Sequence, residues 1–114
     1  MIRILIIGNE GYIGPVVLNE LKSKLINSFV AGFDIGFFAH LNNSSYLPEQ
    51  QLDIQYRGDV RKFPASILEG FNVVVYLAAI SNDPMGNQYQ TVTNEVNCLS
   101  AIKVAAMAKK MKVS

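Results

Sequence analysis

Two kinds of hydrophobic pattern alternate along this chain. Short runs of apolar residues, nearly continuous or alternating, are typical of buried or half-buried strands. They occur at residues 2–7, 29–33, 52–56 and 73–79. Longer segments with apolar residues at helical spacing, or with proline at the start and glycine at the stop, predict helices. These segments are residues 12–26, 64–70 and 88–111.

The elements follow one another as strand, helix, strand, loop, strand, helix, strand and helix. This alternation predicts an α/β fold, in which a parallel sheet has right-handed crossovers and helices on its faces. Residues 35–51 have weak periodicity and are expected to be mostly loop, whereas Val113 and Ser114 would begin a further strand. Ligands of such sheets bind at the carboxyl ends of the strands.

Three glycines, Gly8, Gly11 and Gly14, follow the first strand at a G-x-x-G-x-x-G spacing and lead directly into a helix. A dinucleotide phosphate site needs this context. Gly8 would permit a sharp turn, Gly11 would let the main chain approach a pyrophosphate, and Gly14 would allow close packing. The helix N-terminus would then favour the anion. A plain turn between strand and helix is the alternative interpretation.

Asp34 ends the second predicted strand and lies 20 residues after Gly14. This is the spacing expected for an acid that binds ribose hydroxyls. Its carboxylate would accept hydrogen bonds from the diol and repel a 2′-phosphate. No arginine or lysine follows until Arg57, so the sequence predicts NAD as the cofactor rather than NADP. A solvated aspartate at a strand end is the alternative.

Composition narrows the classes of function. The 114 residues fit one domain, and the net charge of +1 with scattered basic residues argues against a nucleic-acid surface. The one cysteine, Cys98, excludes an intramolecular disulfide and a cysteine-rich metal site, and we expect it in the core. No metal site is predicted. No apolar run has the length of a signal peptide or a membrane span, which makes a cytoplasmic protein the default expectation.

Four motifs in this order carry a family resemblance. They are Gly8-Asn9-Glu10-Gly11-Tyr12-Ile13-Gly14, then Asp34, then Gly58-Asp59-Val60-Arg61, then Val75-Tyr76-Leu77-Ala78-Ala79. Together they resemble the extended short-chain dehydrogenase/reductase family, the NAD-dependent epimerases and dehydratases of nucleotide sugars. The resemblance implies a Rossmann-like parallel sheet with flanking helices, truncated after the fourth strand and its following helix. Residues 1–114 would then be a partial NAD(P)-binding domain, without the fifth strand onward and the substrate domain.

The resemblance also implies cofactor contacts in the glycine turn, at three strand ends and on the last helix. The matching positions are Gly8, Gly11, Tyr12, Ile13, Gly14, Asp34, Asp59, Val60, Leu77, Ala78, Ala79 and Asn97.

Several of these positions have plain alternatives. Asp59 either accepts a hydrogen bond from the adenine amino group or caps the segment that leads to Pro64. Asn97 matches the family's N-V-x-G-T segment, but the glycine and threonine are replaced here, so an outward-facing helix residue is its alternative. Residues 81–84 are interpreted first as a turn and second as cofactor or substrate contacts, and His40 as a loop residue.

The family's catalytic groups, a Tyr-x-x-x-Lys pair and a Ser or Thr, lie beyond the fifth strand. No tyrosine of this chain has a lysine four positions later. We therefore predict no catalytic residue and no activity for this chain alone, which would be a fragment of a longer enzyme or a shortened relative.

The sequence thus predicts the NAD-binding part of a nucleotide-sugar epimerase or dehydratase, whose partner in the full-length enzyme is a nucleotide sugar. A homo-oligomer is expected, because the fourth strand would have an uncovered edge. The alternative from another class is a non-catalytic dinucleotide-binding sensor or assembly module. Which sugar and which reaction apply is not determined by these residues.

Overall fold

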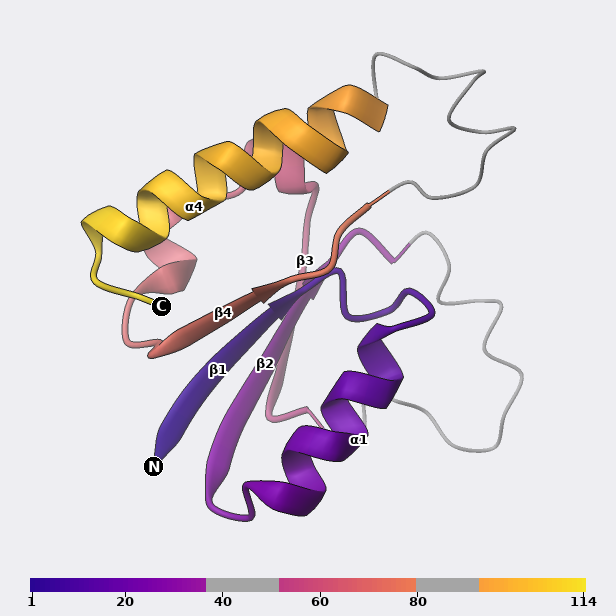
Figure 1. Cartoon of the computed structure of the whole chain (residues 1–114), viewed down its shortest axis with the longest axis vertical. Coiled ribbons are helices and arrows are strands. Elements are labelled where there is room, and N and C mark those ends of the chain that lie inside the picture. Colours follow the sequence, from indigo (N-terminus) through magenta and orange to yellow (C-terminus); the bar gives the residue numbers. More distant parts are fainter. Residues whose placement is uncertain (37–51, 80–92) are drawn as a thin grey trace.

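The computed structural model describes residues 1–36, 52–79 and 93–114, and His40 and residues 81–84 lie outside these ranges. The strands are β1 (Ile2–Ile7), β2 (Ser28–Asp34), β3 (Ile54–Arg57) and β4 (Val73–Tyr76) (Figure 1). The helices are α1 (Gly14–Lys24) and α4 (Ser100–Lys110). Two 3-10 turns, η3 (Val60–Lys62) and η4 (Ala65–Leu68), lie between β3 and β4, and a π-helical turn, η5 (Glu95–Leu99), precedes α4.

The strands form one parallel sheet in the order β3-β2-β1-β4. Helices α1 and α4 lie on opposite faces of it (Figure 1). This arrangement confirms the predicted α/β, Rossmann-like sheet with flanking helices. Because β1 is flanked by β2 and β4, the turn that follows Ile7 leaves the sheet between the ends of its two neighbours.

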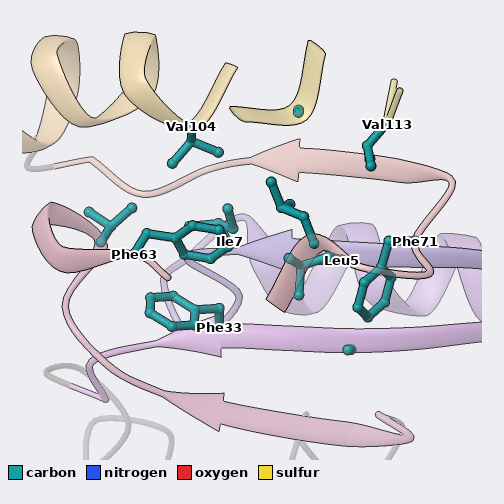
Figure 2. Packing of buried hydrophobic residues seen from close by; sticks show 11 residues of the cluster. Leu5, Ile7, Phe33, Phe63, Phe71, Val104 and Val113 are labelled. Atoms are coloured by element: carbon teal, nitrogen blue, oxygen red, sulfur yellow. The ribbon is translucent and has the colours of Figure 1, made fainter. Parts of the chain in front are cut away.

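Alternate residues of β1 supply the core on both faces of the sheet, as the period of a strand requires. Leu5 and Ile7 are fully buried on the α4 side, with Phe33 and Phe63 nearby (Figure 2). The rings of Phe33 and Phe63 meet edge to face with centroids 4.8 Å apart. The other face of the sheet is packed under α1 by a second cluster, which comprises Ile4, Ile6, Leu18 and Val30.

The last helix buries part of the apolar side that its hydrophobic pattern predicts. Val104 and Ala108 of that side are buried, whereas Leu99 and Ile102 are 53% and 62% exposed. Two residues apart on an α-helix, Ile102 and Val104 point in nearly opposite directions, and Leu99 lies in the π-helical turn η5. Cys98 lies in this turn and is exposed, so its prediction as a core residue is wrong.

Strand β4 has an apolar sequence typical of a strand covered on both faces, yet its four residues are only half-buried. The sheet order explains this, because β4 is the outer strand. Ser114 covers part of its edge: the Val74 N–H donates to the Ser114 carbonyl (2.8 Å), and the Ser114 N–H donates to the Asn72 carbonyl (3.0 Å). This is the pairing expected where a further strand begins.

Asp53, just before β3, connects three elements. Its carboxylate accepts hydrogen bonds from Lys22 Nζ of α1 (2.9 Å) and from the Val30 N–H of β2 (2.8 Å). These bonds, the one from Lys22 above all, hold the pKa of Asp53 below its usual 3.8. Because the folded state has the lower pKa, the stabilisation is present above pH 3.8 and is lost as the pH falls through the folded value.

We therefore expect Asp53→Asn to lower the free energy of unfolding at pH 7 by about 0.5–1 kcal/mol, a value discounted because the pair is partly exposed. The difference should shrink as the pH falls below 3.8 and vanish only below the lower pKa of the folded state. Thermal unfolding followed by circular dichroism between pH 7 and pH 2 measures this difference. The control is Glu20→Gln, which removes an exposed pair with Lys24. Parallel Tm curves for Asp53→Asn and the wild type would contradict the expectation.

Candidate functional site

The turn after β1 depends on glycine at its first position. Gly8 has φ +87°, in the left-handed region, and a Cβ there would lie 2.5 Å from the main-chain nitrogen of Ala78. The Gly8 N–H donates to the Phe33 carbonyl (2.7 Å), and the Leu77 N–H donates to the Ile7 carbonyl (2.7 Å). The turn therefore packs directly against the segment after β4. This contact brings together Gly8, Leu77 and Ala78, three of the predicted site residues.

The other two glycines differ in what the fold demands of them. A Cβ on Gly14 would overlap the main chain of Asn9, so the start of α1 packs against the turn only with glycine there. Among the described residues, a Cβ on Gly11 would touch only the Gly8 carbonyl, at an ordinary 3.7 Å. The described part of the fold thus explains glycine at positions 8 and 14 but not at position 11.

The N-terminus of α1 carries no internal compensation for its positive end. The preceding residue, Ile13, makes no side-chain capping bond, and the first turn contains no acidic residue. Tyr12 and Ile13 are both exposed. A helix N-terminus without a cap or an acid favours an external anion, so the residues present fit a phosphate group.

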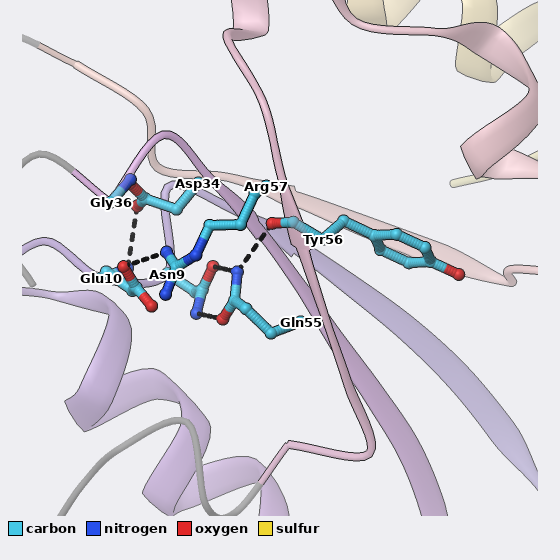
Figure 3. Close-up of polar contacts among 7 residues, drawn as sticks. All are labelled: Asn9, Glu10, Asp34, Gly36, Gln55, Tyr56 and Arg57. Atoms are coloured by element: carbon cyan, nitrogen blue, oxygen red, sulfur yellow. Dashed lines mark hydrogen bonds and ion pairs between the residues drawn. The ribbon is translucent and has the colours of Figure 1, made fainter.

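Asp34 lies at the end of β2, beside this turn. Its Oδ2 accepts a hydrogen bond from the Glu10 N–H (2.9 Å), and its Oδ1 accepts one from the Gly36 N–H (2.8 Å) (Figure 3). Both bonds fix the orientation of the carboxylate. Each carboxylate oxygen can accept more than one bond, so Asp34 keeps acceptor capacity for hydroxyl groups.

A partly buried polar pair, which no pattern in the sequence indicated, ties the turn to β3. Asn9 Nδ2 donates to Gln55 Oε1 (2.6 Å), and Gln55 Nε2 donates to Asn9 Oδ1 (3.2 Å). The Asn9 side chain occupies the space where a Cβ on Gly32 would lie. Buried amides that satisfy each other hold a loop in one conformation, so this pair positions the glycine turn on the sheet.

Glu10 and Arg57 form a second missed contact, an ion pair between the turn and the end of β3 (Figure 3). Gln55 and Arg57 are two residues apart on one strand and therefore share a face. The alternation along the strand indicates that these two polar side chains point to the same side of the sheet. It does not indicate which loop they reach.

Asp59 adopts the capping role, one of its two predicted alternatives. Its carboxylate accepts from the Arg61 N–H (2.9 Å) at the start of η3 and from the Arg61 guanidinium (2.6 Å). Arg61 lowers the pKa of Asp59, chiefly through the side-chain hydrogen bond. The adenine contact of Asp59 stays a prediction. The neighbouring Val60 side chain is in the core, so an adenine contact by Val60 would come from its main chain.

The remaining predicted residues lie at the β4 edge. Leu77 and Ala78 border the glycine turn, Ala79 is exposed, and Asn97 is exposed on η5, which matches the outward-facing alternative. The Tyr76 hydroxyl donates to the Val96 carbonyl (2.8 Å), which ties η5 to β4. Burial raises the pKa of Tyr76 to about 12, so this phenol stays a hydrogen-bond donor at neutral pH.

The described residues form neither a metal site nor a membrane span. Across residues 1–36, 52–79 and 93–114, no group of three or more His, Cys, Asp or Glu residues is placed to hold a metal ion. In the same part of the chain, no helix has the length and apolar character needed to cross a membrane.

Comparison with known proteins gives one family. The model of the NAD dependent epimerase/dehydratase family matches residues 4–114. No curated protein matches the chain in sequence. Among solved structures, an NAD-dependent NDP-hexosamine 5,6-dehydratase involved in tunicamycin biosynthesis is 20% identical with a TM-score of 0.78, over 99% of this chain and 35% of that one.

Two further solved structures contain bound NAD. UDP-glucose-4-epimerase from Stenotrophomonas maltophila is 17% identical, with a TM-score of 0.78, over 100% of this chain and 35% of that one. UDP-glucuronic acid 4-epimerase from Bacillus cereus is 23% identical, with a TM-score of 0.71, over 99% and 38%. At these identities the likeness establishes the fold. The chain spans about a third of the length of these structures.

Proposed function

Because the chain belongs to the NAD dependent epimerase/dehydratase family, we propose that it forms the NAD-binding part of a nucleotide-sugar epimerase or dehydratase. Residues 1–114 are then a partial Rossmann domain, and the fifth strand onward and the substrate domain lie outside it. The family name confirms NAD as the predicted cofactor. The match does not favour the non-catalytic sensor or assembly module.

The observation that carries this proposal is the contrast among the three glycines. Gly8 and Gly14 are required by the fold, whereas no described residue other than Gly8 would contact a Cβ on Gly11. A glycine that the described part of the fold does not need, beside an uncapped helix N-terminus, supports a role in contact with a phosphate group.

The residues have the following proposed roles toward NAD. The pyrophosphate lies over the turn from Gly8 to Gly14, with Tyr12 and Ile13 at the start of α1. Asp34 binds the adenosine ribose, and Asp59 and Val60 contact the adenine. The strand end beside the cofactor and the last helix contribute Leu77, Ala78, Ala79 and Asn97.

When bound, NAD supplies a hydride acceptor for oxidation of a sugar carbon. This chain's own residues bind and orient the dinucleotide, and the absence of a Tyr-x-x-x-Lys pair from the sequence leaves the general base to a part beyond it. The nucleotide sugar is the proposed partner of the full-length enzyme. We place the enzyme in the cytoplasm.

Calorimetry of the chain with NAD and with NADP tests the proposed function. We expect NAD to bind more tightly than NADP, because Asp34 accepts the ribose diol and repels a 2′-phosphate. ADP-ribose, which lacks the nicotinamide, should retain most of the affinity, since the proposed contacts lie mainly on the adenosine half. No measurable binding of NAD, or tighter binding of NADP, would refute the proposal.

We also propose that the chain associates with itself through β4. Beside this strand lies an apolar groove of about 350 Å³, whose lining includes Val74, Tyr76, Val104 and Val113. Ser114 pairs with this edge at Asn72 and Val74, and a strand edge beside an apolar groove favours pairing with another chain.

Light scattering across a concentration series should show a dimer or larger species. Val74→Lys places a charge in the groove and should shift the population toward monomer. The same substitution at Val16, an exposed residue of α1, is the control. A wild type that stays strictly monomeric at millimolar concentration would contradict this expectation.

A further inference from the structure

A buried carboxylate lies within the glycine turn. The Glu10 side chain is 1% exposed and forms an ion pair with Arg57, whose side chain is 49% exposed. Glu10 Oε1 is buried without a hydrogen-bond partner among the described residues. A buried carboxylate of this kind depends on its ion pair for compensation, so the fold holds the Arg57 guanidinium against the turn.

The same guanidinium lies beside the carboxylate proposed to bind ribose. Asp34 and Arg57 are register partners on the parallel strands β2 and β3, so their side chains share one face of the sheet. A Cβ on Gly36 would lie 2.9 Å from Nη1 of Arg57, which places the guanidinium next to the segment that follows Asp34 (Figure 3).

The lack of a basic residue close to Asp34 in sequence favours NAD, yet the fold brings Arg57 alongside Asp34. An arginine beside the adenosine ribose is the group that would pair with the 2′-phosphate of NADP. Preference for NAD therefore needs a further cause, and Glu10 provides one.

We propose that Glu10 is a specificity-determining residue, which holds and neutralises Arg57 so that a 2′-phosphate meets a net negative site. Among the described residues, two carboxylates, those of Glu10 and Asp34, lie beside the one guanidinium of Arg57. A 2′-phosphate added beside these groups is repelled, whereas a ribose hydroxyl donates to Asp34. This inference rests on the proposed function, since it places the adenosine ribose at Asp34.

The test is the ratio of NADP to NAD affinity, measured by calorimetry on the chain and its Glu10→Gln variant. Glutamine keeps the size of the side chain and removes its charge, so Arg57 can pair with the 2′-phosphate. We expect the ratio to rise about tenfold, the order that one neighbouring charge contributes near a protein surface. The ratio of the affinities for adenosine 2′,5′-bisphosphate and 5′-AMP should rise equally, because both ligands need only the adenosine half of the site.

Two further variants identify the source of the effect. In Glu10→Gln/Arg57→Gln the gain for NADP should vanish, because the cation that it depends on is gone. Glu20→Gln removes an equal charge from an exposed pair on α1 and should leave the ratio unchanged. Since the ratio compares two ligands on one protein, a general loss of stability does not change the ratio. If Glu10→Gln prevents folding, Glu10→Ala is used in its place.

The outcomes separate the inference from the proposed function. If the wild type binds NAD and the Glu10 variants leave the ratio unchanged, or if the gain persists in the double variant, Glu10 does not set specificity and the proposed function stands. If the wild type binds neither dinucleotide nor the adenosine fragments, both the proposed function and this inference are overturned.

Discussion

Gly11→Val is expected to weaken NAD binding by about a hundredfold or more, which corresponds to about 2.7 kcal/mol. The reason is steric: the valine side chain would fill the space above position 11, where we place the pyrophosphate. The protein itself should tolerate the change, because among the described residues a Cβ there contacts only the Gly8 carbonyl at 3.7 Å and Gly11 does not have a positive φ. Calorimetry with NAD and thermal unfolding of the same samples measure the two effects.

The neighbouring glycines are the matched controls. Gly8→Ala forces an alanine into φ +87° and against Ala78, and Gly14→Ala creates an overlap with the main chain of Asn9, so both should lower Tm. Gly11→Val should therefore lose binding without losing stability. If it binds NAD as tightly as the wild type, the pyrophosphate does not lie over this turn.

Leu5→Ala is expected to cost about 2–5 kcal/mol of unfolding free energy, a large share of the total for a domain of this size. Leu5 is fully buried at the centre of β1 on the α4 side of the sheet. Its truncation leaves a cavity between the sheet and the segments that cover it. Urea unfolding followed by circular dichroism measures the change. A lower urea midpoint for the variant at an unchanged m value is a loss of stability.

Leu99→Ala is the control for this measurement. The hydrophobic pattern assigns Leu99 to the apolar side of the last helix, but the residue is 53% exposed. Its truncation should change the unfolding free energy by less than about 0.5 kcal/mol. Equal losses for the two leucines would mean that Leu99 is covered in solution, contrary to the exposure described for η5.

The sequence could predict the elements and the edge where the site lies, since both follow from local patterns. The apolar runs of β1 and β2 identify parallel strands, and parallel strands place all their carboxyl ends at one edge of the sheet. The glycine turn and Asp34 follow β1 and end β2, so their neighbourhood was predictable before the register was known. The turn at Gly8 has the conformation that its glycine indicates.

The tertiary structure decided which face of α4 is buried and how β4 is covered. Leu99 and Cys98 lie in the π-helical turn before α4 and are exposed, although their apolar character favours burial. An apolar run cannot show whether its strand is central or outer, because that depends on the order of the strands. Here the order leaves β4 on the outside.

The tertiary structure also decided which charged side chains lie together at the site. Arg57 and Asp34 lie far apart in sequence and become neighbours through the register of β3 on β2. That register depends on side-chain packing across the sheet, which no local pattern encodes. The sequence by itself therefore determined that a dinucleotide turn follows β1 and that an acid ends β2. The contact between Glu10 and Arg57, which places a neutralised guanidinium beside that acid, was decided by the fold.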